Sequence, residues 1–466
     1  MLYENGKVRE IRIAYIGGGS RGWAWKFMTD LAIEPSMSGR VILYDIDGPA
    51  AEINKIIGNK ITARQESVGK WEYETAVSLE EALTGADFVV ISILPGTFDE
   101  MESDVHLPER LGIYQSVGDT AGPGGMIRAL RTIPMLMEFA EAVKKYAPEA
   151  WVINYTNPMS LCIQALYDAF PQIKAFGCCH EVFGTQRLLA DMCRQELGIE
   201  PIKRNEIIVN VQGINHFTWF SEASYKGIDL FPVYKKFVEA HYESGYTDPE
   251  DRETRPSFCC AHRVKFDLFR RYGWIAAAGD RHLAEFMPGN LYLNDPETVK
   301  KWKFGLTTVQ WRKEDQAAKI AKSKKLASGE MRVDMEPSGE EGILLIRALA
   351  GLDRMVSNVN LPNVGQCPDL PLGAVVETNA VFYKDHVRPV MAGKLTEEIQ
   401  ELIMPHIKNH QRILEAAKIC SRELVVQAFL EDPDVKAKCQ DKEKIEALVN
   451  DMIKNTETYL PEGWKK

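Results

Sequence analysis

Residues 11–22 read IRIAYIGGGSRG, and this stretch decides the fold of the chain. Residues 11–16 are rich in Ile and run directly into the glycines, which predicts a short strand, and residues 23–32 predict a helix. Between them, glycines match the pattern G-x-G-x-x-G. A strand, a glycine turn and a helix in this order are typical of a Rossmann unit, whose backbone lies against the pyrophosphate of a dinucleotide. The residues predicted to contact this cofactor are Gly17, Gly18, Gly19, Ser20 and Gly22.

An acid at the end of the next strand indicates which dinucleotide binds. Residues 40–44 predict that strand, and Asp45 follows it directly. A carboxylate at this point accepts hydrogen bonds from the adenosine ribose hydroxyls, which favours NAD over NADP. Asp47 is a second candidate for the same role. The alternative is a glycine-rich turn without a ligand, but the strand, the helix and the acid in register favour a bound nicotinamide cofactor.

Strands and helices alternate through the first part of the chain. Ser78 and Glu81 have the spacing of a capping box, which predicts a helix that ends near Gly85. Residues 87–93 are almost continuously apolar, as a parallel strand buried on both faces should be. Another strand is predicted at residues 151–154, after an amphipathic helix. The alternation predicts a right-handed, doubly wound parallel sheet.

The pattern changes beyond about residue 200. Further strands are predicted at residues 206–211 and 374–383, helices at 343–356 and 396–455, and a polar, exposed loop at 242–256. Strands and helices no longer alternate regularly in this part. We therefore expect an α/β protein with a Rossmann domain over residues 1–200 and a mixed α/β domain over residues 201–466.

Composition excludes several classes of protein. The chain has 466 residues, 45% of them hydrophobic, so more than one domain is expected. Its net charge of −10 argues against a nucleic-acid binder, and no apolar run is long enough to cross a membrane or to act as a signal peptide. The nine cysteines include the adjacent pairs Cys178–Cys179 and Cys259–Cys260, which do not suit a disulfide framework. We expect reduced thiols and a cytoplasmic protein.

Polar clusters follow several of the predicted strands. The glycine-rich block at residues 117–125 and the clusters at 154–158, 177–182 and 213–216 are all expected at the carboxyl edge of the sheet, where α/β enzymes bind ligands. Cys179 and His216 are the candidate metal ligands, because a thiolate and an imidazole can hold a divalent ion and leave positions for substrate oxygens. The alternative is a small buried cysteine and a hydrogen-bonded structural histidine.

The motifs together resemble glycoside hydrolase family four, the NAD- and manganese-dependent glycosidases. The resemblance runs from the IGGGS loop through the Asp119 block, TNP at 156–158, CHEV at 179–182 and GINH at 213–216 to the region of Asp280. It implies a fold like that of lactate and malate dehydrogenases. It also implies that Cys179 and His216 bind the metal, that Asp119 and Asn157 position the substrate, and that His180 assists the departure of the leaving group.

The resemblance also implies a catalytic base. Residues 265–273 resemble the aspartate version of the family and nominate Asp267, with Asp280, His282 and Tyr272 as rivals. The alternative is that Asp267 is a solvated carboxylate paired with a neighbouring Lys or Arg on its helix. In the mechanism that the family implies, NAD oxidises C3 of the sugar, the base removes the C2 proton, the glycosidic oxygen is eliminated, water adds and the hydride returns.

The string Cys179-His180-Glu181-Val182 resembles the α-galacturonidase subgroup of the family. A uronide substrate needs a cation for its carboxylate, and Arg263, Arg281 and Arg128 are candidates. Trp219 and Phe217 are interpreted either as a platform for the sugar ring or as core residues.

Other functions stay open at this point. They are a family-four α-glucosidase or α-galactosidase, an NAD-dependent dehydrogenase of a 2-hydroxy acid or a sugar, and a non-catalytic NAD-binding regulator. The resemblance implies a homo-oligomer, a dimer or a tetramer.

Overall fold

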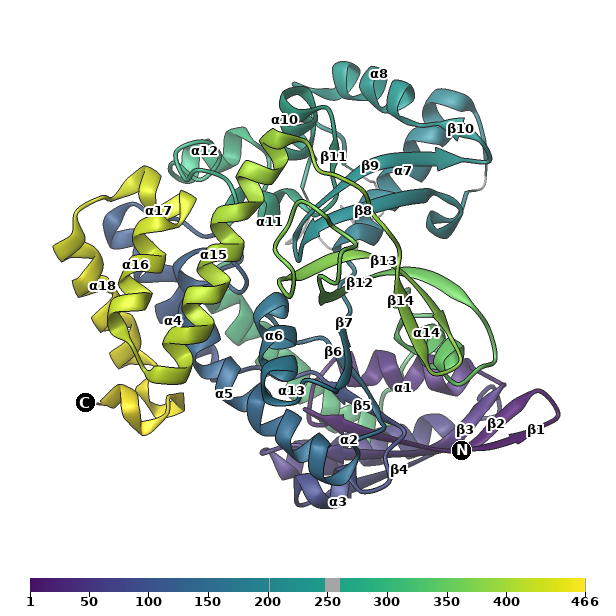
Figure 1. Ribbon diagram of the computed structural model, residues 1–466. Helices are drawn as coiled ribbons and strands as arrows, with labels where there is room; N and C mark the ends of the chain where they lie inside the picture. The colour runs from purple at the N-terminus through teal and green to yellow at the C-terminus, as the bar shows by residue number, and fades with distance from the viewer. Residues whose placement is uncertain (201, 248–259, 466) are drawn as a thin grey trace.

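The computed structural model describes residues 1–200, 202–247 and 260–465, and Figure 1 shows them arranged around two sheets. The larger sheet contains the parallel strands that the sequence predicts, in the spatial order β4-β3-β2-β5-β6-β7. Their bounds are Lys7–Ile16 for β2, Met37–Tyr44 for β3, Lys70–Ala76 for β4, Phe88–Ile91 for β5, Trp151–Asn154 for β6 and Lys174–Gly177 for β7. This is the strand order of a Rossmann fold. The chain first adds β3 and β4 on one side of β2 and then adds β5, β6 and β7 on its other side.

Helices cover both faces of this sheet. On one face lie α1 (Trp23–Ile33), α2 (Gly48–Thr62) and α14 (Gly342–Leu349), and on the other lie α3 (Leu79–Leu83), α5 (Gly122–Tyr146) and α6 (Met159–Ala169). Each face has its own apolar core, and residues from both cores alternate along β2. The prediction of a doubly wound α/β fold is confirmed.

Strands from beyond residue 200 complete the larger sheet. β12 (Met355–Pro362) pairs antiparallel with β7 at Gly177, and β13 (Val375–Tyr383) and β14 (His386–Pro389) follow it outward. The short β1 (Leu2–Glu4) pairs with β2. The predicted boundary near residue 200 stays a prediction, but the sheet itself extends across it.

The predicted helix over residues 343–356 is partly wrong. α14 ends at Leu349, and Met355 already begins β12. Gly351 has φ +84°, a left-handed conformation that commonly ends helices. The periodicity of the apolar residues continues past this point and does not reveal the end.

The second sheet is antiparallel and drawn in teal in Figure 1. It contains β8 (Ile208–Ile214), β9 (Phe217–Tyr225), β10 (Ile228–Asp229) and β11 (Ile275–Ala276). Its helices are α7 (Glu181–Leu197), α8 (Phe231–His241), α10 (Arg263–Tyr272), α11 (Asp280–Glu285) and α12 (Pro296–Lys301). Residues 242–247 form no helix or strand, and the rest of the predicted 242–256 loop lies outside the described residues.

The remaining helices connect the two parts. α13 (Val309–Ser328) lies against the Rossmann helices, where Lys319 approaches Gly22 and Lys322 lies over the Trp25 ring. α15 (Glu397–Ile419), α16 (Arg422–Glu431), α17 (Pro433–Lys438) and α18 (Lys442–Asn455) form the yellow group in Figure 1. They confirm the helices predicted at 396–455. Among the described residues, no helix has the length and apolar character needed to cross a membrane.

Candidate active site

Backbone conformation and close contacts exclude side chains from the glycine loop. Gly17 has φ +91°, and a Cβ at this residue would overlap the carbonyl of Ser92. A Cβ at Gly19 would lie 2.8 Å from Ala50 Cβ and 2.9 Å from a carboxylate oxygen of Asp45. Gly22 precedes α1, and no side chain caps the N-terminus of this helix. Its first backbone N–H groups are therefore available to an anion, as a pyrophosphate site requires.

Of the two acids predicted for the ribose, Asp45 contacts the glycine loop. Its carboxylate accepts hydrogen bonds from Gly19 N at 2.8 Å and from Asp47 N at 2.9 Å. Burial raises the pKa of Asp45. Asp47 instead caps α2 by accepting from Ala50 N. The geometry therefore favours Asp45 for a ribose contact.

Asp119, His216 and His282 form a cluster of potential metal ligands from three separate segments. Their side-chain ligand atoms all lie within 4.8 Å of one another, and the two imidazole rings have centroids 3.8 Å apart. Asp119 precedes α5, and His282 lies on α11. The Thr120 hydroxyl is 3.0 Å from Nδ1 of His216 and fixes the orientation of that ring.

The sequence predicts His216 at the carboxyl edge of the parallel sheet, and this prediction is wrong. His216 lies instead at the tip of a hairpin. Ile214 pairs with Phe217 across β8 and β9, so Asn215 and His216 form a two-residue turn. His216 has φ +64°, which is uncommon for a residue with a side chain. The hairpin brings this imidazole from the second sheet to the Asp119 loop. The glycines at 122–125 form the first turn of α5 and not an open loop.

Burial and mutual repulsion determine the charges in the cluster. Burial and the neighbouring His282 lower the pKa of His216 to about 3. Burial alone would raise the pKa of Asp119, but Arg128, His282 and His216 together lower it below its ordinary range. The cluster therefore combines a neutral imidazole with an ionised carboxylate, and both are ligand types for a divalent cation.

Glu181 joins the cluster to His180. One of its carboxylate oxygens is 3.7 Å from Nε2 of His282 and 4.0 Å from Nε2 of His180, and the other accepts a hydrogen bond from Gly279 N. Burial raises the pKa of Glu181, but the surrounding histidines outweigh it and bring it to about 2. The sequence interpretation assigned no role to Glu181, although an acid in the first turn of a helix beside a predicted catalytic histidine was a usable signal.

Cys179 lies at the end of β7, next to the cluster but not within it. Its thiol is buried and contacts the side chain of Asn215, the neighbour of His216 in the hairpin. Burial and the nearby Glu377 and Glu181 raise the pKa of Cys179 well above its ordinary value. The assignment of Cys179 as a metal ligand stays a prediction.

Trp23 and Asn157 lie between the cofactor loop and the cluster. The ring of Trp23, the first residue of α1, lies 5.7 Å from the ring of His180. Asn157 has a buried side-chain oxygen without a hydrogen-bond partner among the described residues. Its backbone carbonyl accepts from Nε of Arg128. The predicted cofactor site and the predicted substrate residues are thus contiguous.

Asp267 lies apart from this cluster. Its carboxylate accepts hydrogen bonds of 2.6 Å each from Tyr242, Tyr292 and Arg271. Burial raises its pKa, but these three donors outweigh it and lower the pKa. The structure therefore supports the pairing with Arg271 that the alternative predicted, but Asp267 is buried and not solvated. Its three donors favour a structural carboxylate over a catalytic base.

Among the rivals of Asp267, only His282 belongs to the described cluster. Asp280 is fully buried and accepts from the backbone N–H groups of Val264 and Lys265 at the start of α10. Tyr272 packs edge-to-face against Trp219. His282 also has a buried Nδ1 without a hydrogen-bond partner in the described part of the chain.

Trp219 and Phe217 are core residues. Both side chains are fully buried, and Phe217 stacks on Phe286 with centroids 4.9 Å apart. They leave no ring face for a sugar.

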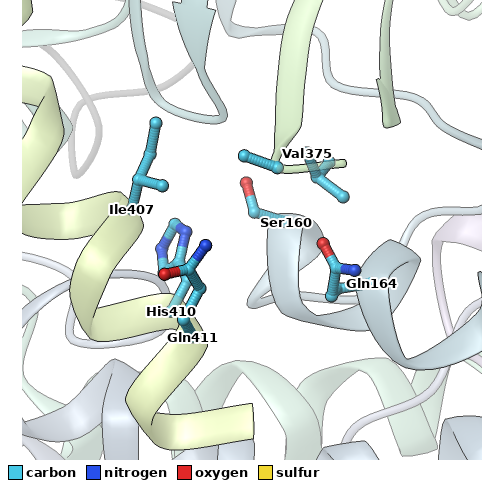
Figure 2. A pocket seen from close by; sticks show the side chains of 7 residues that line it. Ser160, Gln164, Val375, Ile407, His410 and Gln411 are labelled. Atoms are coloured by element: carbon cyan, nitrogen blue, oxygen red, sulfur yellow. The ribbon is translucent and has the colours of Figure 1, made fainter. Parts of the chain in front are cut away.

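A separate small pocket lies between α6, β13 and α15. Figure 2 shows the side chains that line it, among them Ser160, Gln164 and His410. Its volume of about 20 Å³ has room for about one water molecule. It is too small for a sugar. The candidate active site is the cluster around His216, because it gathers imidazole and carboxylate groups next to His180.

Comparisons with known proteins show the family of the chain. The sequence model described as Family 4 glycosyl hydrolase matches residues 12–195, and that of the Family 4 glycosyl hydrolase C-terminal domain matches residues 211–435. An alpha-galacturonidase from Lachnoclostridium phytofermentans is 63% identical over 465 residues, with 100% of both chains covered.

Two solved structures have the same fold. The crystal structure of the protein lplD from Bacillus subtilis has a TM-score of 0.90 and 52% identity, covering 96% of this chain and 100% of that one. A 6-phospho-alpha-glucosidase from gut microorganisms, in complex with NAD and Mn²⁺, has a TM-score of 0.79 and 19% identity, covering 97% and 99%. The two matched sequence models together span most of the chain, which therefore belongs to the family 4 glycosyl hydrolases.

Proposed function

We propose that this glycosidase hydrolyses α-galacturonides with the help of NAD and a divalent cation such as Mn²⁺. The observation that carries the proposal is the relative that is 63% identical over its whole length and is named an alpha-galacturonidase. The site supports the same chemistry, because a dinucleotide loop and a cluster of imidazole and carboxylate groups lie on either side of His180.

The residues present fit both groups. The uncapped start of α1 and the glycines at 17, 19 and 22 would hold the pyrophosphate, and Asp45 would bind the ribose. His216 and Asp119 would hold the cation, and the resemblance adds Cys179, whose thiol lies next to this cluster. When bound, NAD takes a hydride from the sugar and the cation acts as a Lewis acid toward the oxidised oxygen.

The remaining side chains would bind the sugar and move its protons. The unpartnered oxygen of Asn157 accepts a hydrogen bond from a sugar hydroxyl. His282, oriented by the Glu181 carboxylate, removes the proton from C2. His180, on the other side of Glu181, protonates the departing glycosidic oxygen. Water would then add across C1 and C2, with its hydroxyl going to C1 and a proton going to C2, and C3 would regain its hydride from bound NAD.

The test is hydrolysis of 4-nitrophenyl α-D-galacturonide under reducing conditions, with NAD⁺ and Mn²⁺ added or omitted. We expect hydrolysis only when both are present, and in D₂O we expect deuterium at C2 of the released sugar. Hydrolysis that continues after complete removal of NAD⁺ would overturn the proposal. Accumulation of NADH in proportion to substrate would indicate a dehydrogenase instead.

We also propose that the enzyme is a cytoplasmic homo-oligomer. Every cysteine within the described ranges is free, which suits a reducing compartment. Light scattering of the purified protein would determine the number of subunits, and a monomer at micromolar concentration would contradict the proposal.

A further inference from the structure

Arg128 has unused hydrogen-bond donors beside the candidate active site. Its side chain is only 6% exposed, and Nε donates to the carbonyl of Asn157 at 3.1 Å. Its terminal amino groups have no acceptor and no ion pair within 4.0 Å among the described residues. The Asp119 carboxylate is near enough to raise the pKa of Arg128, but it forms no ion pair with Arg128 within 4.0 Å. A buried guanidinium with free donors is costly unless an acceptor is supplied.

Arg312, in the first turns of α13, brings a second guanidinium to the same place. Its Nε is buried without a partner, and none of its nitrogens has an acceptor in the described part of the chain. The chain just before α13 is fixed to the Asp119 loop, since Thr307 N donates to the carbonyl of Ser116 at 3.1 Å. Arg128 and Arg312 repel each other electrostatically. Two guanidinium groups whose terminal amino groups lack an acceptor among the described residues can donate to one anion between them.

The other arginines considered for this role are already engaged. Arg263 donates to the carbonyls of Tyr242 and Lys301 and to Glu243. Arg281 donates to the carbonyls of Gly305 and Ser116. Both guanidinium groups are therefore occupied by acceptors from the protein.

We infer that Arg128 and Arg312 together form an anionic subsite that binds the carboxylate of a uronide. The inference rests on the proposed function and deepens it, because it attributes the preference for a uronic acid over a neutral sugar to these two arginines. Asn157 and Arg128 then act as one unit, since Asn157 orients the guanidinium through its carbonyl and offers its side chain to the same ligand. Arg312 contributes the second guanidinium from α13, a helix that carries no other residue of the predicted site.

The test compares wild type with Arg312→Gln and Arg312→Lys, all in the presence of Mn²⁺. Calorimetry measures the Kd of NAD⁺ on protein freed of NAD⁺ and the Kd of D-galacturonate on NAD⁺-loaded protein, and kinetics measure kcat/KM for 4-nitrophenyl α-D-galacturonide and α-D-galactoside. In Arg312→Gln we expect a roughly 100-fold loss for the galacturonide and for galacturonate binding, since a charge-assisted pair is lost. The galactoside and NAD⁺ values should change less than about threefold, and Arg312→Lys should recover part of the loss.

The matched control is Lys324→Gln, which removes one exposed cation from the same helix. It should behave like wild type. The control thus distinguishes the loss of one positive charge anywhere on α13 from the loss of the subsite. An unchanged Kd for galacturonate in Arg312→Gln would overturn the inference, as would an equal loss for galactose-based ligands. Weakened NAD⁺ binding alone would assign the pair to a cofactor phosphate. Failure of the wild type to hydrolyse the galacturonide would contradict the proposed function itself.

Discussion

At the scale of single residues, the site depends on which polar groups are satisfied by the protein and which are not. Asp267 has three donors of its own, and Asp280 accepts from the backbone of α10. By contrast, His282 keeps a free Nδ1, and Asn157 keeps a free oxygen, among the described residues. Groups that lack a protein partner in a buried site are the ones that a substrate can engage.

This distinction gives a direct comparison between His282→Gln and Asp267→Asn. We expect His282→Gln to lower the rate of C2 proton exchange by roughly 10²- to 10⁴-fold, because it removes the base. Asp267→Asn should leave the exchange rate within about threefold of wild type but lower the free energy of unfolding by about 1–3 kcal/mol, because buried donors lose a charged acceptor. Both quantities are measurable on the same samples, by NMR of exchange in D₂O and by denaturant unfolding. The reverse pattern would restore Asp267 as the base.

The sequence indicated candidate site residues more readily than the contacts between them. The structure places His216 in a cluster with Asp119 and His282 and links His180 to that cluster through Glu181, whereas Cys179 lies beside the cluster and Asn157 contacts Arg128. The roles of Glu181 and Arg312 depend largely on residues that lie far away in the sequence, such as His282 for Glu181, although the adjacent His180 was a local signal for Glu181. In the structure, Glu181 is recognised by the imidazole near its carboxylate, and Arg312 is recognised by the lack of an acceptor among the described residues.

At the scale of elements, the glycine loop shows how a turn depends on the absence of side chains. Asn54 of α2 donates to the carbonyls of Gly18 and Ser20 and holds the loop against the helix. The strand, the loop and α1 were predictable, because their pattern is local. The hairpin that presents His216 was not, because its two-residue turn contains no glycine and the turn is set by the pairing of β8 with β9.

Gly19→Ala tests the loop. Its new Cβ would lie 2.8 Å from Ala50 Cβ and 2.9 Å from Asp45, so the loop must shift away from the ribose acid. We expect the Kd of NAD⁺ to rise by about tenfold or more, since a charge-assisted contact is lost. The control is Gly48→Ala in α2, where an added Cβ meets no atom within 4 Å. Equal Kd values for the two variants in a fluorescence titration would contradict this reading of the loop.

At the scale of the whole molecule, buried acids connect the C-terminal helices with the active-site loop. Asp434 of α17 is fully buried, and neither of its oxygens has a partner among the described residues. Burial and the neighbouring Asp432 and Glu285 raise its pKa well above the ordinary value. Glu285 accepts from Val117 N and Gly118 N, next to Asp119, and burial raises its pKa to about 7.

The raised pKa values give a pH dependence of stability. A carboxyl whose pKa is higher in the folded than in the unfolded state binds its proton more tightly when folded, so stability falls as pH rises from about 4 toward 7 and above. Asp434→Asn removes one such group. We expect it to be more stable than wild type at pH 8 by at least about 1 kcal/mol, with a smaller difference at pH 5.

Calorimetric unfolding at the two pH values measures this difference. Glu415→Gln, which changes an exposed carboxylate on α15, is the control and should show the same difference from wild type at both. A stability difference for Asp434→Asn that does not depend on pH would mean that its carboxyl does not titrate abnormally.

The larger sheet takes its last strands, β12 to β14, from a part of the chain that follows the whole second sheet in sequence. A gene fragment that ended near residue 200 would encode β7 as an open edge, with unpaired backbone groups that invite aggregation. The cofactor-binding half is therefore not a cassette that recombination can exchange between enzymes.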